Sequence, residues 1–357
     1  MVAGDPRRWR DTSERLAIVT SDNNALDRFQ QLPQIVAVVD DSIGVTVEGV
    51  PVELVVAPRE RFGTELLRAT GSEAYVAALE PLPTGASEEE VYAQLGVPWC
   101  PPELREEPHR DEPPALLELA DVRGDLHCHT TWSDGKASVL EMGEAARERG
   151  YEYLAICDHT PSVGAVPGLT ADMVRRQGEE IAAANERLAP FRILRGTECD
   201  ILRDGSLDLP DDVLAELDWV QASVHGGQRM PTRELTKRTV EAMRNPYVRC
   251  LSHPKGRIIN HRPENALDLD RVFEVALKTG VALEVNGRPD RLDLRGEHVR
   301  NAIEAGVKIV VSTDAHSVRG LGNMELAVHT ARRGWATAAD ILNTQPLVQL
   351  LRRRRQK

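Results

Sequence analysis

Hydrophobic and polar positions follow one pattern up to about residue 120 and a different pattern beyond it. Residues 15–78 contain short runs rich in β-branched residues, separated by polar breaks: LAIVT, IVAVV and IGVTVEGVPVELVVA. The last run alternates with a period of two on both sides of Glu48 and Gly49, which predicts a β-hairpin that turns there. These patterns predict a small α+β domain over residues 1–80.

Residues 81–120 are rich in proline and glutamate, as in PLPTGASEEE and VPWCPPELREEPHRDEPP. Such a composition buries too little apolar surface to fold alone, which predicts a connector that lies against its neighbours. Within it, ASEEEVYAQLG predicts one short helix, with Ser87 as the N-cap and Glu90 at the capping-box position.

From residue 121 onward, apolar runs that end in polar residues alternate with amphipathic stretches. The predicted strands are DLHCH, YLAICDH, FRILRGTE, WVQASVH, VRCLSHP, ALEVN and KIVVSTDAH. The predicted helices are VLEMGEAARERG, MVRRQGEEIAAANERLA, ELTKRTVEAMR, LDRVFEVALKTG, EHVRNAIEAG and NMELAVHTARRG. Strands that alternate with helices form parallel sheets. We therefore predict an α/β fold in which a distorted, TIM-like (β/α)7 barrel spans residues 121–357, one strand short of the eightfold form.

The composition is that of a globular protein with an aliphatic core. Hydrophobic residues make up 41% of the 357 residues and aromatic residues only 4%. No apolar run approaches the roughly 18 residues that span a bilayer, and the first residues lack the apolar segment of a secretory signal. The five cysteines form no CxxC pair, which predicts reduced, mostly buried thiols. We expect a cytoplasmic protein without a membrane partner.

The net charge of −12 is concentrated in the first third of the chain. Residues 1–120 hold 22 acidic and 10 basic side chains and no lysine, whereas the remaining residues hold 34 of each sign. Phosphate contacts need lysine and arginine. The asymmetry therefore argues against a broad DNA-binding surface on the first domain.

Each predicted barrel strand ends in a polar side chain, and these side chains are 27 to 39 residues apart. One βα unit takes about 30 residues, so all of them are expected at the C-terminal end of the barrel, where barrel enzymes build active sites. His127 shares strand parity with His129, so both should point inward while Cys128 points away. The strand-end residues are His129, His159, Glu198, His225, His253, Asn286 and Asp314.

Six of the ten histidines fall at these strand ends, and Asp134, Glu198 and Asp314 accompany them. One such histidine alone is more often a structural residue, but six at barrel spacing predict a metal cluster. Histidine and carboxylate ligands without cysteine suit Zn, Mn or Fe. Asp158 has the opposite parity to its neighbour His159, so we expect it to orient the ligands from outside the cluster.

The motifs HCH…SDG, CDH, GTE, SVH, SHP and STDAH resemble those of the polymerase-and-histidinol-phosphatase (PHP) superfamily. HPKGRIINHRP, EVNGRPDRLDL, KIVVSTDAHS and ARRGWATAADILNT resemble the PHP domain of bacterial family X DNA polymerases. The resemblance implies three divalent metal ions and nine ligands, all present here. One ion would be held by His127, His129, Glu198 and Asp314, a second by Glu198, His225 and His253, and the third by Asp134, His159 and His316.

The resemblance implies hydrolysis of phosphate esters, with Glu198, Asp314 and His316 as the predicted catalytic residues. Two metal ions activate water and neutralise the phosphoryl oxygens in such reactions. Basic side chains that follow two of the strands are candidates for binding the substrate phosphate. These are Lys255, Arg257, Arg288 and Arg291, of which we favour Arg257 and Arg291.

Residues 15–105 resemble the palm, thumb and connector of family X polymerases, but only as remnants. The family's first palm strand carries paired aspartates, whereas the strand here reads ERLAIVTS. The PVELVV strand keeps one carboxylate, Glu53. Nucleotidyl transfer by two metal ions needs more carboxylates than this, so no polymerase activity is expected.

Three functions remain open on the sequence. The resemblance favours a 3′-5′ DNA exonuclease, with single-stranded DNA or DNA 3′ ends as partners, and the basic run at 352–355 agrees with it. The alternative is a phosphatase of small phosphate esters, of the histidinol-phosphatase type. The third is an accessory protein with a structural metal cluster, which nine ligands argue against because structural zinc sites are closed and four-coordinate.

Overall fold

The computed structural model describes residues 1–109 and 111–352. The chain folds into two compact units, Met1–Ala115 and Leu116–Lys357. Most of the RRRR run lies outside the described residues, since Arg352 is the last of them.

The N-terminal unit contains a five-stranded sheet in the order β1-β2-β5-β4-β3. The predicted hairpin is confirmed: β4 and β5 are antiparallel, and Gly49 turns between them at φ 80°. Glu53 pairs in register with Ala17 and lies 3.4 Å from the Arg15 guanidinium. The elements are β1 (Val2–Ala3), α1 (Gly4–Arg7), β2 (Leu16–Thr20), α2 (Ala25–Phe29), β3 (Ile35–Asp40), β4 (Ile43–Thr46), β5 (Pro51–Val56), α3 (Phe62–Thr70), α4 (Glu73–Leu79) and α5 (Glu88–Leu95).

The N-terminal unit extends to Ala115 and so includes most of the segment predicted as a connector. Helix α5 begins as predicted, because Ser87 Oγ accepts from the Glu90 N–H, although the Glu90 carboxylate accepts from Ala86 N. Inside the unit, the buried Glu88 carboxylate accepts bidentate bonds from Arg105 and from Arg7 of α1. These ion pairs tie the proline-rich segment to the sheet domain.

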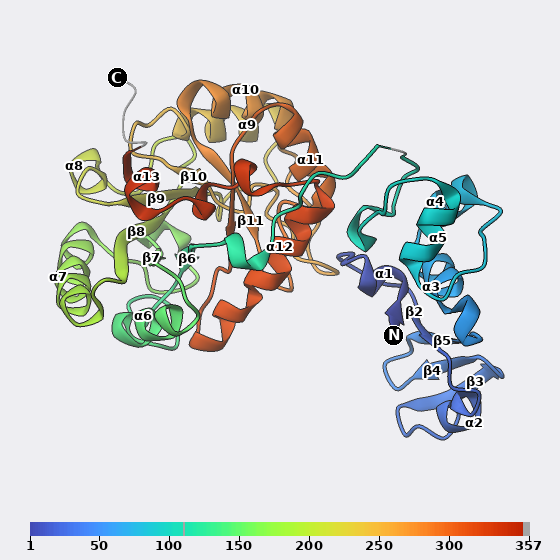
Figure 1. The fold of residues 1–357 in the computed structure, drawn as a ribbon. Coiled ribbons are helices and arrows are strands. Elements are labelled where there is room, and N and C mark those ends of the chain that lie inside the picture. The colour runs from blue at the N-terminus through green and yellow to red at the C-terminus, as the bar shows by residue number, and fades with distance from the viewer. Residues whose placement is uncertain (110, 353–357) are drawn as a thin grey trace. The chain divides into compact units, whose positions relative to one another are not determined.

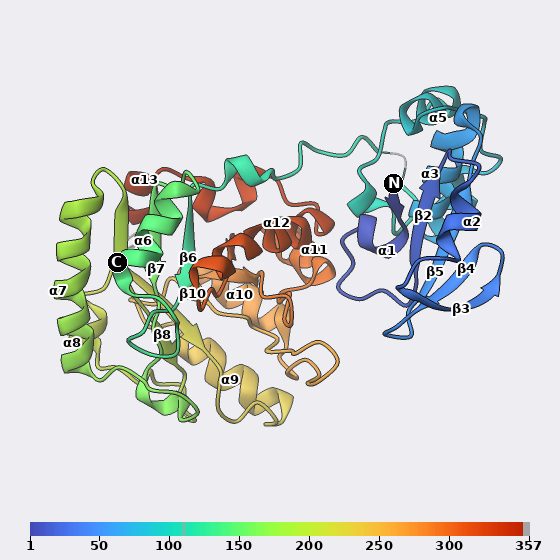
Figure 2. The same cartoon turned by 90° about the horizontal axis from the view of Figure 1, so that it is seen from below.

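The second unit is a nearly closed barrel of seven parallel strands in the order β12-β11-β10-β9-β8-β7-β6, with helices around it (Figures 1 and 2). All seven predicted strands and six predicted helices are present. The strands are β6 (Gly124–Cys128), β7 (Tyr153–Ile156), β8 (Arg192–Asp200), β9 (Trp219–Ser223), β10 (Cys250–Leu251), β11 (Ala282–Asn286) and β12 (Ile309–Ser312). The helices are α6 (Val139–Glu148), α7 (Ala171–Leu188), α8 (Asp211–Leu214), α9 (Thr232–Ala242), α10 (Leu269–Thr279), α11 (Gly296–Glu304), α12 (Met324–Arg333) and α13 (Leu347–Arg352).

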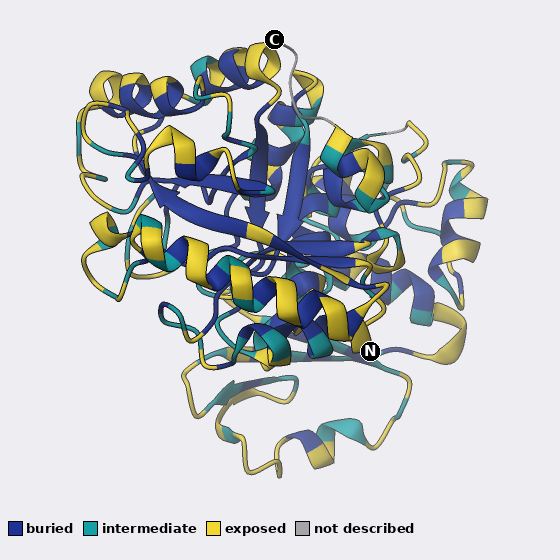
Figure 3. Cartoon of the chain, turned by 90° about the vertical axis from the view of Figure 1, so that its left-hand side faces the viewer, coloured by how far each residue is buried: buried dark blue, intermediate teal, exposed yellow. Residues whose placement is uncertain are grey.

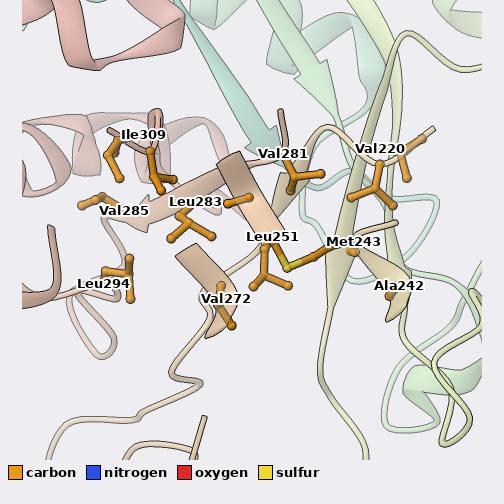
Figure 4. Close-up of a cluster of buried hydrophobic side chains, with 14 of the residues drawn as sticks. Val220, Ala242, Met243, Leu251, Val272, Val281, Leu283, Val285, Leu294 and Ile309 are labelled. Atoms are coloured by element: carbon orange, nitrogen blue, oxygen red, sulfur yellow. The ribbon is translucent and has the colours of Figure 1, made fainter. Parts of the chain in front are cut away.

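The barrel has an apolar core on each side of its strands. One buried cluster takes residues from all seven strands and fills the N-terminal part of the interior: Leu126, Tyr153, Ala155, Leu194, Trp219, Cys250, Ala282 and Val310 belong to it. Outward-facing strand residues such as Leu251 and Leu283 pack instead against helix residues such as Val272 (Figure 4). The strands are therefore buried on both faces, apart from the exposed Arg192 and Arg195 of β8, while the surrounding helices keep exposed outer faces (Figure 3).

The sheet closes between β6 and β12 without an eighth strand. At one end, Cys128 and Ala315 form a single parallel bridge. At the other end, the fully buried side chain of Asn343 donates to the carbonyls of Gly124 and Val311, both at 2.7 Å, and accepts from Val311 N at 3.2 Å. The Asn343 side chain thus makes hydrogen bonds to β6 and β12 that a neighbouring strand would otherwise make.

Replacing Asn343 with alanine is expected to lower the free energy of unfolding of the barrel by about 3 kcal/mol, because two carbonyls and one N–H are left buried without partners. Urea denaturation followed by circular dichroism measures this. A loss of less than about 0.5 kcal/mol would mean that the closure does not depend on this side chain.

All five cysteines of the chain are buried and unpaired. Cys128 and Cys199 pack under the helices, Cys157 and Cys250 inside the barrel, and Cys100 in the N-terminal unit. No helix among the described residues combines the length and the apolar character needed to cross a membrane.

Candidate metal centre

A β-bulge in β6 aims two histidines into the barrel. Between the pairs Asp125–Leu154 and Cys128–Ile156, β6 has one residue more than β7. Below the bulge Leu126 joins the interior apolar cluster, and above it Cys128 packs under α6 and α7. A bulge shifts the alternation of side chains by one residue. His127 therefore points into the barrel, and so does His129.

The side chains of His127, His129 and Asp314 meet at the C-terminal end of the barrel. The Nε2 atoms of the two histidines lie 3.1 Å apart, and Asp314 Oδ1 is 3.1 Å from His129 Nε2. Both His127 and His129 are fully buried. Three ligand atoms therefore converge on one point from the first and last strands of the sheet.

The carboxylate of Glu198 on β8 lies between two groups of histidines. Its Oε1 is 2.8 Å from His253 Nε2 and 3.3 Å from His225 Nε2. Its Oε2 is 3.1 Å from His159 Nδ1 and 3.4 Å from His127 Nε2. Each oxygen faces a different pair of rings. Of the three candidate ligand groups among the described residues, the one formed with His159 and His225 includes Glu198, so a bridging role for Glu198 stays a prediction.

Asp134 extends the cluster toward the barrel mouth. Its carboxylate oxygens lie 3.2 Å from His316 Nε2 and 3.7 Å from His159 Nε2. The loop that carries Asp134 is held by Asp158, which accepts from Thr130 N at 2.8 Å and Ser133 Oγ at 2.5 Å. Asp158 thus orients a ligand loop from outside the cluster, in agreement with its strand parity.

The electrostatics pull the histidines of the cluster in opposite directions. Burial lowers the pKa values of His127 and His225, but neighbouring carboxylates outweigh it, so that the pKa of His127 lies well above its usual range and that of His225 rises to about 10. A metal ligand must be neutral, so a metal ion that bound these two rings would displace protons from them. Burial lowers the pKa of His129 to about 3, and His159 acts in the same direction, so the ring is neutral. Burial raises the pKa values of Glu198 and Asp314, but the surrounding histidines outweigh it and hold both well below their usual range.

The residues present fit divalent metal ions. His129 Nδ1 and His253 Nδ1 are buried and have no hydrogen-bond partner among the described residues. Three sets of histidine and carboxylate atoms each lie within 4.8 Å of one another. Imidazole nitrogens and carboxylate oxygens together suit Zn, Mn and Fe. Two of the residues, His253 and Asp314, also have positive φ angles of 22° and 51°, the backbone strain often found at functional sites.

The predicted substrate-binding residues separate into two groups. Lys255 Nζ donates to Leu267 O at 3.3 Å, and Arg257 donates to the carbonyls of Arg291 and Leu292, so these two hold the loops around the site. The Arg291 side chain lies 3.7 Å from Asp314, and its Nε and Nη1 have no hydrogen-bond partner among the described residues. Substrate contact stays a prediction for all three, and the geometry favours Arg291.

Two carboxylates beside the cluster were not predicted. Asp200 on β8 accepts from His225 Nδ1 at 3.0 Å, and Glu284 on β11 accepts from His127 Nδ1 at 2.6 Å. Strand parity carries the signal for both: Asp200 follows Glu198 by two residues, and Glu284 precedes Asn286 by two residues.

Comparison with known proteins places the barrel in one family. The family model of the PHP domain matches residues 125–287. The DNA polymerase/3′-5′ exonuclease PolX of Bacillus subtilis is 39% identical over 97% of this chain, which spans 66% of that relative's length. A probable phosphatase of Thermoanaerobacter sp. is 30% identical over 62% of this chain and 89% of its own length.

Among solved structures, a histidinol phosphate phosphatase of Lactococcus lactis, in complex with zinc, L-histidinol and phosphate, aligns with 14% identity and a TM-score of 0.42. That alignment covers 58% of this chain and 93% of the other.

Proposed function

Because the chain belongs to the PHP family, we propose that it is a metal-dependent phosphoesterase that removes nucleotides from the 3′ end of single-stranded DNA. The observation that carries the proposal is the convergence of histidines and carboxylates from all parts of the barrel on one centre. The proposed metal ligands are His127, His129, Asp134, His159, Glu198, His225, His253, Asp314 and His316.

The substrate approaches the centre from the side of Asp134 and His316. Their side chains are each 24% exposed, whereas His127, His129 and Glu198 are sealed beneath them. Arg291, whose Nε lies 3.7 Å from Asp314 Oδ2 and whose Nε and Nη1 have no hydrogen-bond partner among the described residues, binds a non-bridging oxygen of the phosphate from the β11 side. Arg288 lies on the same side, 3.9 Å from Asp314, with its guanidinium partly held by Asp290.

When bound, divalent ions lower the pKa of a water molecule and neutralise the phosphoryl oxygens during displacement. Glu198, whose pKa lies well below its usual range, stays ionised, and its two oxygens, which face His253 and His159, would be available to metal ions as ligands. A 2.8 Å contact between His316 Nδ1 and the carbonyl of Asp314 orients the imidazole ring and leaves its Nε2 directed at Asp134.

The choice of DNA is supported by the B. subtilis relative, whose name includes a 3′-5′ exonuclease and whose similarity runs over both units of this chain. The second candidate, a phosphatase of small phosphate esters, is supported by the Thermoanaerobacter relative, whose similarity covers 62% of this chain.

The test is digestion of a 5′-labelled single-stranded oligonucleotide with Mn²⁺, with the His316→Ala variant beside the wild type. We expect a ladder that shortens from the 3′ end and is absent with the variant. Intact DNA together with hydrolysis of p-nitrophenyl phosphate would favour the small-ester phosphatase. If the protein retains bound metal but hydrolyses neither the DNA nor p-nitrophenyl phosphate, the enzymatic proposal is overturned.

A further inference from the structure

The interior of the barrel has a polar layer between its apolar core and the metal centre. The apolar cluster includes Trp219, Cys250, Ala282 and Val310 on four adjacent strands. Two residues farther along each of these segments, the interior position is polar and buried: Gln221, Ser252, Glu284 and Ser312. Glu284 is the only carboxylate among these four, and its side chain is fully buried.

The Glu284 carboxylate accepts from donors on five segments. Oε1 accepts from His127 Nδ1 at 2.6 Å, Ser312 Oγ at 2.5 Å and Gln221 Nε2 at 3.3 Å. Oε2 accepts from the His253 N–H at 2.7 Å, Ser252 Oγ at 3.0 Å and Asn286 Nδ2 at 3.3 Å. A carboxylate offers about four lone-pair sites, so six donors saturate both oxygens. Glu284 is thus engaged by protein donors rather than placed as a tenth metal ligand.

The donors link Glu284 to ligands on three other strands. Its bond to His127 Nδ1 fixes the ring tautomer and leaves Nε2 facing His129 and Glu198. Its bond to the His253 N–H holds that residue at its strained φ of 22°. The Asn286 amide donates both to Glu284 and, at 3.0 Å, to Asp314 Oδ2.

We propose that Glu284 is a positioning residue that sets the geometry of His127, His253 and Asp314 together, and so sets the affinity of the centre for metal. The inference rests on the metal centre of the proposed function but not on its substrate. Asp200 offers a contrast, because it contacts one ligand histidine, His225, and one of its carboxylate oxygens has no partner among the described residues.

The test is titration of the metal-stripped full chain with Mn²⁺ against a competing chelator, in the wild type and in Glu284→Gln. The substitution keeps the size of the side chain but turns one acceptor into a donor that faces other donors. Loss of a carboxylate that orients a ligand histidine weakens metal binding about 10- to 100-fold, and we expect a loss in that range. Affinity within threefold of the wild type, in a folded variant, would overturn the inference.

Asn343→Ala is the matched control, because it weakens the same barrel but contacts no ligand; its metal affinity should equal that of the wild type. If Glu284→Gln does not fold, Gln221→Met decides. Gln221 has its one side-chain hydrogen bond among the described residues with Glu284, so a weaker Mn²⁺ affinity supports the inference and an unchanged affinity overturns it. A wild type that binds no Mn²⁺ would instead remove the metal centre itself.

Discussion

The Glu198→Gln enzyme is expected to hydrolyse phosphate esters at least a thousandfold more slowly than the wild type, a loss of about 4 kcal/mol of transition-state stabilisation. The Glu198 carboxylate lies within 3.4 Å of nitrogens from four histidines, and each of its oxygens faces a different pair. An amide in its place turns an NH₂ group toward one pair and removes the negative charge from the centre. The rate with p-nitrophenyl phosphate or labelled DNA, whichever the wild type hydrolyses, measures the effect.

Glu152→Gln is the control for this result, because Glu152 precedes β7 at the opposite end of the barrel and forms a half-exposed pair with Arg123. It should retain the wild-type rate. If Glu198→Gln is folded and within tenfold of the wild type, Glu198 does not bridge the two halves of the centre.

The Glu88→Ala substitution is expected to cost the N-terminal unit about 3–5 kcal/mol, the range for removing one partner of a buried ion pair. Arg105 is fully buried and donates to both oxygens of Glu88, so its charge is left without a carboxylate. Thermal unfolding of the N-terminal unit measures the change. Glu89→Ala, at the exposed neighbouring position, should stay within about 0.5 kcal/mol of the wild type.

The same ion pairs give the N-terminal unit a dependence on pH. Burial raises the pKa of Glu88, but the bonds from Arg7 and Arg105 outweigh it and hold the pKa below the ordinary 4.5. A carboxylate with a lowered pKa stabilises the fold fully above its unfolded pKa, and this stabilisation falls as the pH drops through the folded value. Equal stabilities of Glu88→Ala and the wild type at neutral pH would contradict the assignment.

The barrel was predictable because its strands and helices differ in the period of their hydrophobic pattern and because each strand ends in a polar residue. The short helices α8 and α13 escaped prediction because four to six residues carry too little periodicity. The burial of Glu88 also escaped prediction. Glu88 lies in an acidic run that reads as solvated, and only its pairing with two distant arginines makes it a buried residue.

Most of the proposed ligands were visible because they lie at or just after strand ends with the spacing of βα units, whereas Asp134 lies in the loop between β6 and α6. Glu284 lies two residues before the strand-end residue Asn286, and a single polar residue within an apolar run is easily overlooked. The directions of the arginines were not readable, because they depend on loop conformation. Arg257 bonds to the carbonyl of Leu292, a residue with a φ of 47°, and the same loop leaves the Arg291 guanidinium beside Asp314.

Because all five thiols are buried, their reaction with a thiol reagent can report local unfolding of the protein. A thiol reagent reacts with a buried cysteine only when the surrounding structure opens. Cys100 serves the N-terminal unit alone, while Cys128, Cys157, Cys199 and Cys250 serve the barrel. The rate at which Cys100 is labelled therefore measures the opening of the N-terminal unit. The rate at which the other four cysteines are labelled measures the opening of the barrel, in the same unmodified chain.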